Sequence, residues 1–223
     1  MSNDILEILE FTQTELARFL RFRAGLSNPN FGGGQKGTVG GVYNLRLQQH
    51  PEEYARLLVF LREQNAKSYL ELGVGQGGSF LLNSLMQENL EVCHAVDDCD
   101  YQRNAPGFWD QNISIEKSVI DLKEIKRKDN IKFFNKKSND FFVKNDLTYD
   151  IIFIDADHRY EGVKKDYAEA VQVLNPHGFL IFHDIINYDP GIGVPQFWSE
   201  LDKDKKIREF KDSGFAGIGI YKP

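Results

Sequence analysis

Short apolar runs alternate with segments of helical periodicity over most of the chain. The runs have the length and composition of buried strands; they are KSYLEL (67–72), EVCHAVD (91–97), IKFF (131–134), YDIIFID (149–155) and FLIFHD (179–184). Helical spacing of apolar residues separates them and predicts helices over 51–64, 77–88, 113–127, 139–144 and 160–174. Because apolar strands that alternate with helices form parallel sheets covered on both faces, the pattern predicts an α/β fold.

The two ends of the chain depart from this alternation. The first ~20 residues carry an apolar stripe and predict one helix, whose apolar face would pack on the body, on a partner subunit or as a lid. The stripe consists of Ile5, Leu9, Leu16, Phe19 and Leu20. Near the other end, a helix over 194–202 precedes KIREF and GIGIYK, and the short gap between these two strands favours a hairpin over a parallel crossover. The expected sheet is therefore doubly wound and mostly parallel, with an antiparallel C-terminal strand and helices on both faces.

The glycine-rich segment NPNFGGGQKGTVGGVYN (28–44) separates the N-terminal helix from this body. Its order Lys36-Gly37-Thr38 does not match a P-loop, in which Gly-Lys precedes Ser or Thr. Either this is a flap over a site, with residues 31–41 closing on it, or it is a plain connector. We therefore divide the chain into 1–50, an N-terminal helix with a glycine-rich flap, and 51–223, the main domain.

Composition narrows the function classes. A net charge of -6 and a pI near 5.4 argue against a general binder of the nucleic-acid backbone. We find no apolar run near the ~20 residues of a membrane span, and no signal-peptide layout at the N-terminus. Two cysteines, Cys93 and Cys99, suit a reducing compartment. We expect a cytoplasmic protein whose partners include neither nucleic acid nor membrane.

The segment YLELGVGQGGS (69–79) joins the first strand of the body to its helix. Gly73 allows a tight turn and Gly75 allows close approach of a ligand, but the G-x-G-x-x-G match is by itself weak evidence for a dinucleotide site. Glu71 would repel a pyrophosphate, yet it can accept hydrogen bonds from an ammonium group. Asp97, at the end of the second strand, can bind a ribose diol. A ligand with an amino acid at one end and a nucleoside at the other fits both acids, and S-adenosylmethionine is such a ligand.

With E-L-G-V-G-Q-G, the acid at Asp97 and an antiparallel last strand, the sequence resembles the class I S-adenosylmethionine-dependent methyltransferases. The block FIDADHRYEGVKKDYAEAVQVLNPHGFLIFHD (153–184) is similar to the small-molecule O-methyltransferases of the macrocin and cephalosporin types. The resemblance covers roughly residues 50–223 and implies a Rossmann-like sheet, so that 51–223 would be a methyltransferase domain.

The resemblance also implies roles for individual residues. Gly73 and Gly75 would contact the methionine moiety and Asp97 the ribose. Ser79 and Ser138 lie where related enzymes contact the cofactor. Lys136-Lys137-Ser138 stands where the family often has Gly-Asp-Ser, which is a departure at the adenine contact.

Two further carboxylates end neighbouring predicted strands. Asp155 ends the fourth strand and Asp184 the fifth, so both could meet at one edge of the sheet and share a divalent ion. In the resembling metal-dependent enzymes, acids at these positions bind Mg²⁺. Here His183 precedes Asp184, and because imidazole suits Mn²⁺, Fe²⁺ or Zn²⁺ better than Mg²⁺, His183 either changes the metal or stays outside its first shell.

His158 falls where the family places its catalytic base, a role that a near-neutral imidazole suits. Other interpretations stay open at this stage. Asp155 could accept backbone amides or bind the cofactor amine, His158 could cap the following helix, and His183 could be a buried histidine with its hydrogen bonds satisfied.

The sequence therefore predicts an S-adenosylmethionine-dependent O-methyltransferase that acts on a hydroxyl of a small molecule, a sugar or a natural-product intermediate. A divalent metal such as Mg²⁺ or Mn²⁺ and a histidine base would assist the transfer. The aromatic segments 101–112 and 186–198 could wall the substrate pocket. An NAD-dependent oxidoreductase and a non-catalytic cofactor-binding protein are the alternatives. Related enzymes are often oligomeric, so a homo-oligomer is a further expectation.

Overall fold

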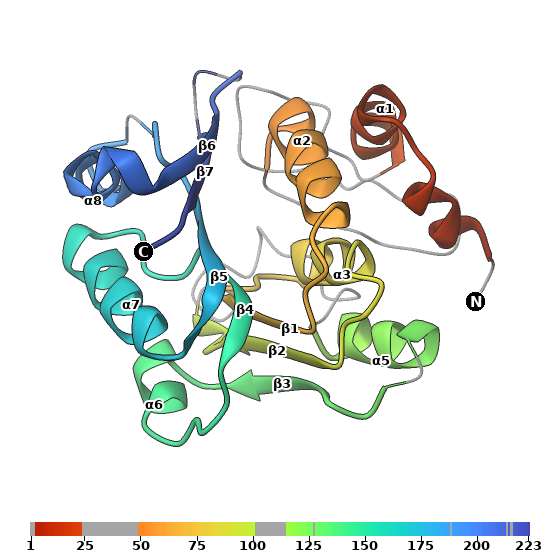
Figure 1. Cartoon of the computed structure of the whole chain (residues 1–223), viewed down its shortest axis with the longest axis horizontal. Helices are drawn as coiled ribbons and strands as arrows, with labels where there is room; N and C mark the ends of the chain where they lie inside the picture. The colour runs from red at the N-terminus through yellow and green to blue at the C-terminus, as the bar shows by residue number, and fades with distance from the viewer. Residues whose placement is uncertain are drawn as a thin grey trace.

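A computed structural model describes residues 3–23, 49–100, 115–126, 128–187, 189–212, 214 and 216–223. In this part of the chain, one sheet of seven strands has the order β3-β2-β1-β4-β5-β7-β6 (Figure 1). The strands are β1 (Ser68–Leu72), β2 (Val92–Asp97), β3 (Ile131–Asn135), β4 (Tyr149–Ile154), β5 (Leu174–His183), β6 (Lys206–Phe210) and β7 (Ile218–Tyr221). The first five pair in parallel, whereas β7 lies antiparallel between β5 and β6. The predicted doubly wound, mostly parallel sheet with an antiparallel C-terminal strand is confirmed.

Helices cover both faces of the sheet (Figure 1). One layer contains α1 (Gln13–Arg23), α2 (Pro51–Arg62), α3 (Gly78–Leu85) and α5 (Ile115–Lys126). The other contains α6 (Ser138–Phe142), α7 (Tyr160–Gln172) and α8 (Val194–Glu200). Two 3-10 helices, η1 (Asn3–Leu9) and η2 (Lys203–Lys205), complete the described elements. Outside the N-terminal region, the end of α7 and the start of β5, the predicted boundaries lie within three residues of these.

The two helical layers enclose two separate apolar cores. Alternate residues of β1 serve both: Tyr69 packs in the core under α2 and α3, while Leu70 and Leu72 pack in the core under α7 and α8. Every residue of β1 is buried. This double burial explains why the central strands are apolar throughout instead of alternating with polar residues.

The N-terminal stripe forms two helices instead of the single predicted one. Thr12 interrupts it: its hydroxyl accepts from the backbone N–H of Glu15 at 3.3 Å, and Glu15 accepts in return from the Thr12 backbone N–H at 2.8 Å. This reciprocal capping box starts α1, and the spacing Thr12-x-x-Glu15 was its signal in the sequence. Arg62 of α2 donates to the carbonyls of Leu9 and Phe11 at 2.7 and 2.8 Å. Of the three options for this helix, the structure shows packing on the body.

A second correction concerns the end of α7. The sequence predicted a helix to residue 174 and a strand from residue 179, but α7 ends at Gln172 and β5 already begins at Leu174. The register between β4 and β5 shifts here, which lets a strand accommodate a proline. Asn175 holds this start by donating to Asp150 of β4 at 2.7 Å.

None of the described helices has the length and apolar character needed to span a bilayer. The predicted flap, including residues 31–41, and the aromatic segment 101–112 lie outside the described residues.

His94 of β2 provides a test of the packing. Its side chain is 4% exposed, lies among the rings of Phe134, Phe141 and Tyr149, and its Nδ1 is 2.7 Å from the Tyr149 hydroxyl. Burial lowers the pKa of His94 from 6.5 to about 4. Below pH 6.5 the unfolded chain therefore takes up a proton that the folded protein rejects until about pH 4, and stability falls over this range.

We expect this histidine to cost about 2 kcal/mol of unfolding free energy between pH 8 and pH 5. His94→Asn keeps an N–H near the Nδ1 position and removes the titration, so urea denaturation of this variant should show a flatter pH dependence. His177→Asn changes an exposed histidine and is the control. Equal pH slopes for wild type and His94→Asn would contradict the expectation.

Candidate active site

The carboxyl ends of β1, β2, β4 and β5 lie at one edge of the sheet (Figure 1). Because β4 neighbours both β1 and β5, with Ile154 level with Leu72 and with Phe182, the residues that follow these strands meet. The predicted adjacency of the strands carrying Asp155 and Asp184 is confirmed. This is the edge where open α/β sheets bind their ligands.

Gly73 lies directly against the backbone of Asp155. Its φ is +77°, as a tight turn out of β1 requires, and a Cβ at this position would lie 2.1 Å from the Asp155 carbonyl oxygen. The Asp155 N–H donates to the carbonyl of Leu72 at 2.9 Å. The glycine loop and the end of β4 are therefore one packed unit, in which residue 73 has no space for a side chain.

Asp97 holds the glycine loop in place. Its Oδ2 accepts from the backbone N–H groups of Val74 and Gly75, both at 2.8 Å, and its Oδ1 accepts from the N–H of Cys99 at 2.7 Å. The structure thus adds a structural role for Asp97 that the sequence did not indicate. Ribose binding by Asp97 and methionine contact by Gly73 and Gly75 stay predictions.

Glu71 is fully buried, and its oxygens accept hydrogen bonds from protein hydroxyls. Ser79 Oγ donates to Oε1 at 2.5 Å, and the Tyr69 hydroxyl donates to Oε2. Burial raises the pKa of Glu71 to about 8, although these two hydroxyls oppose the rise. Glu71 and Ser79, both predicted to contact the cofactor, therefore contact each other in this structure.

A buried polar chain extends from Glu71 to α2. Asn83 of α3 donates to the Tyr69 hydroxyl at 2.9 Å and accepts from the hydroxyl of Tyr54 at 2.9 Å. Tyr54 and Asn83 were not among the predicted site residues. The signal for Asn83 was the single amide side chain in the helix GSFLLNSL.

Ser138 makes its hydrogen bond with helix α7. It begins α6, and its Oγ donates to Asp166 of α7 at 2.5 Å. Burial raises the pKa of Asp166 to about 6, and this carboxyl is 2% exposed. The cofactor contact predicted for Ser138 stays a prediction.

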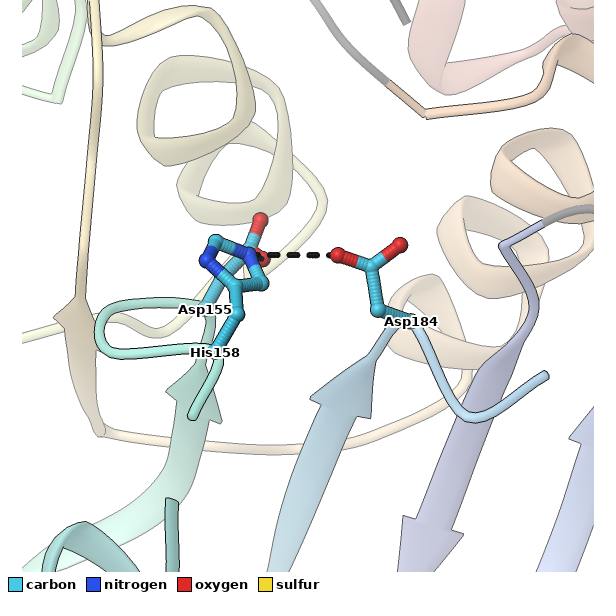
Figure 2. Close-up of side chains that lie close together, drawn as sticks. All are labelled: Asp155, His158 and Asp184. Carbon is cyan, nitrogen blue, oxygen red and sulfur yellow. Dashed lines mark hydrogen bonds and ion pairs between the residues drawn. The ribbon is translucent and has the colours of Figure 1, made fainter. Parts of the chain in front are cut away.

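Asp155, His158 and Asp184 form a compact centre at the ends of β4 and β5 (Figure 2). His158 Nε2 lies 3.2 Å from Asp155 Oδ1 and 3.1 Å from Asp184 Oδ2. One ligand atom from each of the three residues lies within 4.8 Å of the others. Sequence reasoning named the two carboxylates as metal ligands and His158 as a base; the structure places His158 itself among the candidate ligands.

The centre is an ion cluster. Burial disfavours a charged His158, but the hydrogen bonds and charges of Asp155 and Asp184 raise the pKa of His158 to about 10. Burial likewise disfavours ionised carboxylates, yet the nearby imidazoles hold the pKa of Asp155 and of Asp184 below the usual range. In this arrangement the two carboxylates favour the protonated form of His158. Its role as the catalytic base stays a prediction.

His183 supports the same carboxylates from inside the protein. Its Nδ1 lies 3.2 Å from Asp155 Oδ1 and 3.6 Å from Asp184 Oδ2, and the ring is 6% exposed. Its buried Nε2 has no hydrogen-bond partner among the described residues. The interpretation of His183 as a satisfied buried histidine stays open, since residues 24–48 and 101–114 lie outside the described part of the chain. The prediction of His183 as a metal ligand stays a prediction.

Three further groups at this centre were not predicted. Gln49 Nε2 donates to Asp155 Oδ2 at 3.3 Å, and Asn187 Nδ2 donates to Asp184 Oδ1 at 3.0 Å. The N–H of Gly193 donates to the carbonyl of His158 at 2.7 Å, which ties the loop after β5 to the turn after β4. Each comes from a connecting segment, where hydrophobic periodicity carries no information.

The sequence that forms this sheet and its site matches a known protein family. A family model described as a methyltransferase domain matches residues 70–185, about half of the chain, from the third residue of β1 to just beyond β5. The chain belongs to this methyltransferase family. The predicted class, an S-adenosylmethionine-dependent methyltransferase of class I, is confirmed.

Solved structures agree with the fold. The O-methyltransferase TomG from Streptomyces achromogenes aligns with a TM-score of 0.57 at 14% identity over 93% of this chain and 94% of that one. An O-methyltransferase from Bacillus cereus aligns with a TM-score of 0.54 at 14% identity over 100% of this chain and 92% of that one. At this identity the likeness shows the fold alone.

Two curated proteins are similar in sequence. Protein R132 of Acanthamoeba polyphaga mimivirus is 25% identical over 170 residues, which are 71% of this chain and 70% of that protein. Protein y4gI of Sinorhizobium fredii is 36% identical over 56 residues. These are 25% of this chain but only 6% of y4gI, so the methyltransferase spans a small part of that relative.

Because Gly73 contacts the backbone of Asp155, adding one methyl group at residue 73 should lower the stability of the fold substantially. Gly73→Ala combines a positive φ with a collision against backbone, and should lower the unfolding free energy by roughly 3 kcal/mol or more. Gly214→Ala is the matched control, because Gly214 has φ +65° and, its chain neighbours aside, no atom of the described residues lies within 4 Å of the place that an added methyl group would take.

The control should cost only the left-handed conformation, about 1–2 kcal/mol. Urea denaturation of both variants measures the difference, which is the contribution of the collision. Equal losses in the two variants would show that Gly73 is required only for its backbone conformation.

Proposed function

We propose that this methyltransferase transfers a methyl group from S-adenosylmethionine to a hydroxyl of a small molecule, with a divalent cation held by Asp155 and Asp184. The observation that carries the proposal is the centre of two largely buried carboxylates and an imidazole, packed directly against the glycine loop through Gly73. The methyl donor and the acceptor hydroxyl would thus bind next to each other at one edge of the sheet.

The donor half rests on the glycine loop. Asp97 fixes the backbone of Val74 and Gly75, and such a preorganised loop suits close contact with a nucleoside–amino acid ligand. The solved structure of TomG is a complex with S-adenosylmethionine, and that of the Bacillus cereus enzyme contains S-adenosylhomocysteine. The family match also favours a methyltransferase over the NAD-dependent oxidoreductase considered above.

The donor atoms of the centre fit a divalent cation. Asp155 and Asp184 supply hard, ionised oxygens, and the imidazole of His158 lies within reach of both. A nitrogen ligand favours Mn²⁺, Fe²⁺ or Zn²⁺ over Mg²⁺, whereas coordination by the carboxylates alone would suit Mg²⁺. When bound, such a cation would supply Lewis-acid chemistry that lowers the pKa of an acceptor hydroxyl.

His158 is the proposed general base. In the arrangement described here both carboxylates raise its pKa to about 10, which favours its protonated form. A divalent cation bound to the same carboxylates would add positive charge beside His158 and would lower the pKa of the imidazole. The neutral imidazole could then accept the hydroxyl proton while the oxygen attacks the methyl carbon and the carbon–sulfur bond of the donor breaks.

The acceptor class is part of the proposal. TomG is an O-methyltransferase involved in tomaymycin synthesis, and the resemblance of residues 153–184 is to small-molecule enzymes. A sugar or natural-product hydroxyl is therefore the acceptor that we propose. Incubation with S-adenosylmethionine and a panel of hydroxylated compounds should yield S-adenosylhomocysteine. If cofactor binds but no acceptor is methylated, the non-catalytic alternative gains support.

Calorimetry tests the donor and the cation separately. We expect micromolar binding of S-adenosylhomocysteine in EDTA, and a distinct isotherm for Mn²⁺ or Mg²⁺ in the purified protein. Asp155→Asn and Asp184→Asn should each abolish the metal isotherm, because each removes one anionic ligand from the centre.

Asp157→Asn is the matched control, since Asp157 lies in the same turn but pairs with Arg159 at the surface. It should leave metal binding unchanged. An intact metal isotherm in both Asp155→Asn and Asp184→Asn would place the ion elsewhere, and absence of any cofactor binding would contradict the proposed donor.

A further inference from the structure

The side chain of Gln49 enters the centre from a segment that the sequence did not connect with it. Gln49 immediately precedes His50 and α2, is 4% exposed, and donates through Nε2 to Asp155 Oδ2 at 3.3 Å. The other oxygen of this carboxylate, Oδ1, faces His158 and His183, each at 3.2 Å. Both carboxylate oxygens of Asp155 therefore have hydrogen-bond partners, and Gln49 is the partner of Oδ2.

The backbone that carries Gln49 is held by α2. The His50 carbonyl accepts from the N–H of Tyr54 at 2.9 Å, and the Tyr54 hydroxyl is bonded within the buried polar chain to Asn83. Glu53, also fully buried, accepts from the N–H of Gly217 beside β7 at 3.2 Å. The first turn of α2 is thus hydrogen-bonded to α3 and to the loop before β7, and residue 49 lies two positions before this turn.

An amide suits this position chemically. Its N–H fixes one lone pair of Oδ2 and leaves the remaining lone-pair directions of the carboxylate available for another partner. Being neutral, it adds no positive charge that would repel a cation, unlike Lys or Arg. Hydrogen bonds to a ligating carboxylate orient it, and their loss typically weakens metal binding 10- to 100-fold.

We propose that Gln49 is a positioning residue that orients the Asp155 carboxylate for the divalent cation. This inference rests on the proposed function, because it concerns the same site. Residue 49, which the sequence analysis grouped with the N-terminal helix and flap (1–50), would then belong to the metal site of the methyltransferase.

Metal titration of the full chain tests this role. Gln49→Met keeps the length and burial of the side chain and removes the N–H donor, so we expect the Kd for Mn²⁺ to rise about 10-fold. The Kd for S-adenosylhomocysteine and the urea midpoint should stay near the wild-type values. A residue with only a structural role would change the midpoint without this selective loss of metal affinity.

Gln87→Ala is the control variant. Gln87 is also a buried glutamine, and its Nε2 donates to the carbonyl of Leu61 at 2.6 Å, away from the centre. It should lower the urea midpoint and leave the Kd for Mn²⁺ unchanged. An unchanged Kd for Mn²⁺ in Gln49→Met would overturn the positioning role alone, whereas a wild-type protein that binds no metal would overturn both this role and the proposed cation.

Discussion

The pairing of β1 with β4 is the constraint on which the rest of the site depends. The two strands run parallel and end level with each other, so the loop after one and the turn after the other must share the same space. Gly73 shows how tightly they do so, because only a residue without a side chain fits beside the Asp155 carbonyl. The cofactor loop and the charged centre are therefore packed together by sheet geometry, before any side-chain chemistry is considered.

Charge compensation then determines what the centre can contain. Two carboxylates that are nearly excluded from water are costly unless cations or donors face them, and here two imidazoles and two side-chain amides do so. The same set of groups explains why the carboxylates stay ionised while the histidine proton is held strongly. A bound cation would replace part of this compensation with its own charge.

Much of this arrangement could be predicted from the sequence, and the exceptions have physical reasons. Strand periodicity located Asp155 and Asp184, because parallel strands bring their ends together whatever the loops do. The position of Gln49 could not be predicted, since it depends on how α2 packs on the sheet. The pairing of Glu71 with Ser79 was missed because a strand residue and a helix residue eight positions apart meet only through the turn at Gly73. The early start of β5 was hidden by Pro176 and Gly178, which usually end elements but here lie within the register shift between β4 and β5.

The buried polar chain through Tyr54, Asn83 and Tyr69 has a consequence for alignment of the helices. Apolar contacts are not directional, so an interface made of apolar side chains alone loses little free energy when one helix shifts along its neighbour. A slip of α2 by one turn would break the hydrogen bond between the hydroxyl of Tyr54 and Oδ1 of Asn83 in the core, at about 1–3 kcal/mol for each group left without a partner. The hydrogen bonds between these hydroxyls and amides therefore favour a single position of α2 along its neighbours. They thereby also fix the position of the residues at the start of α2, near the site.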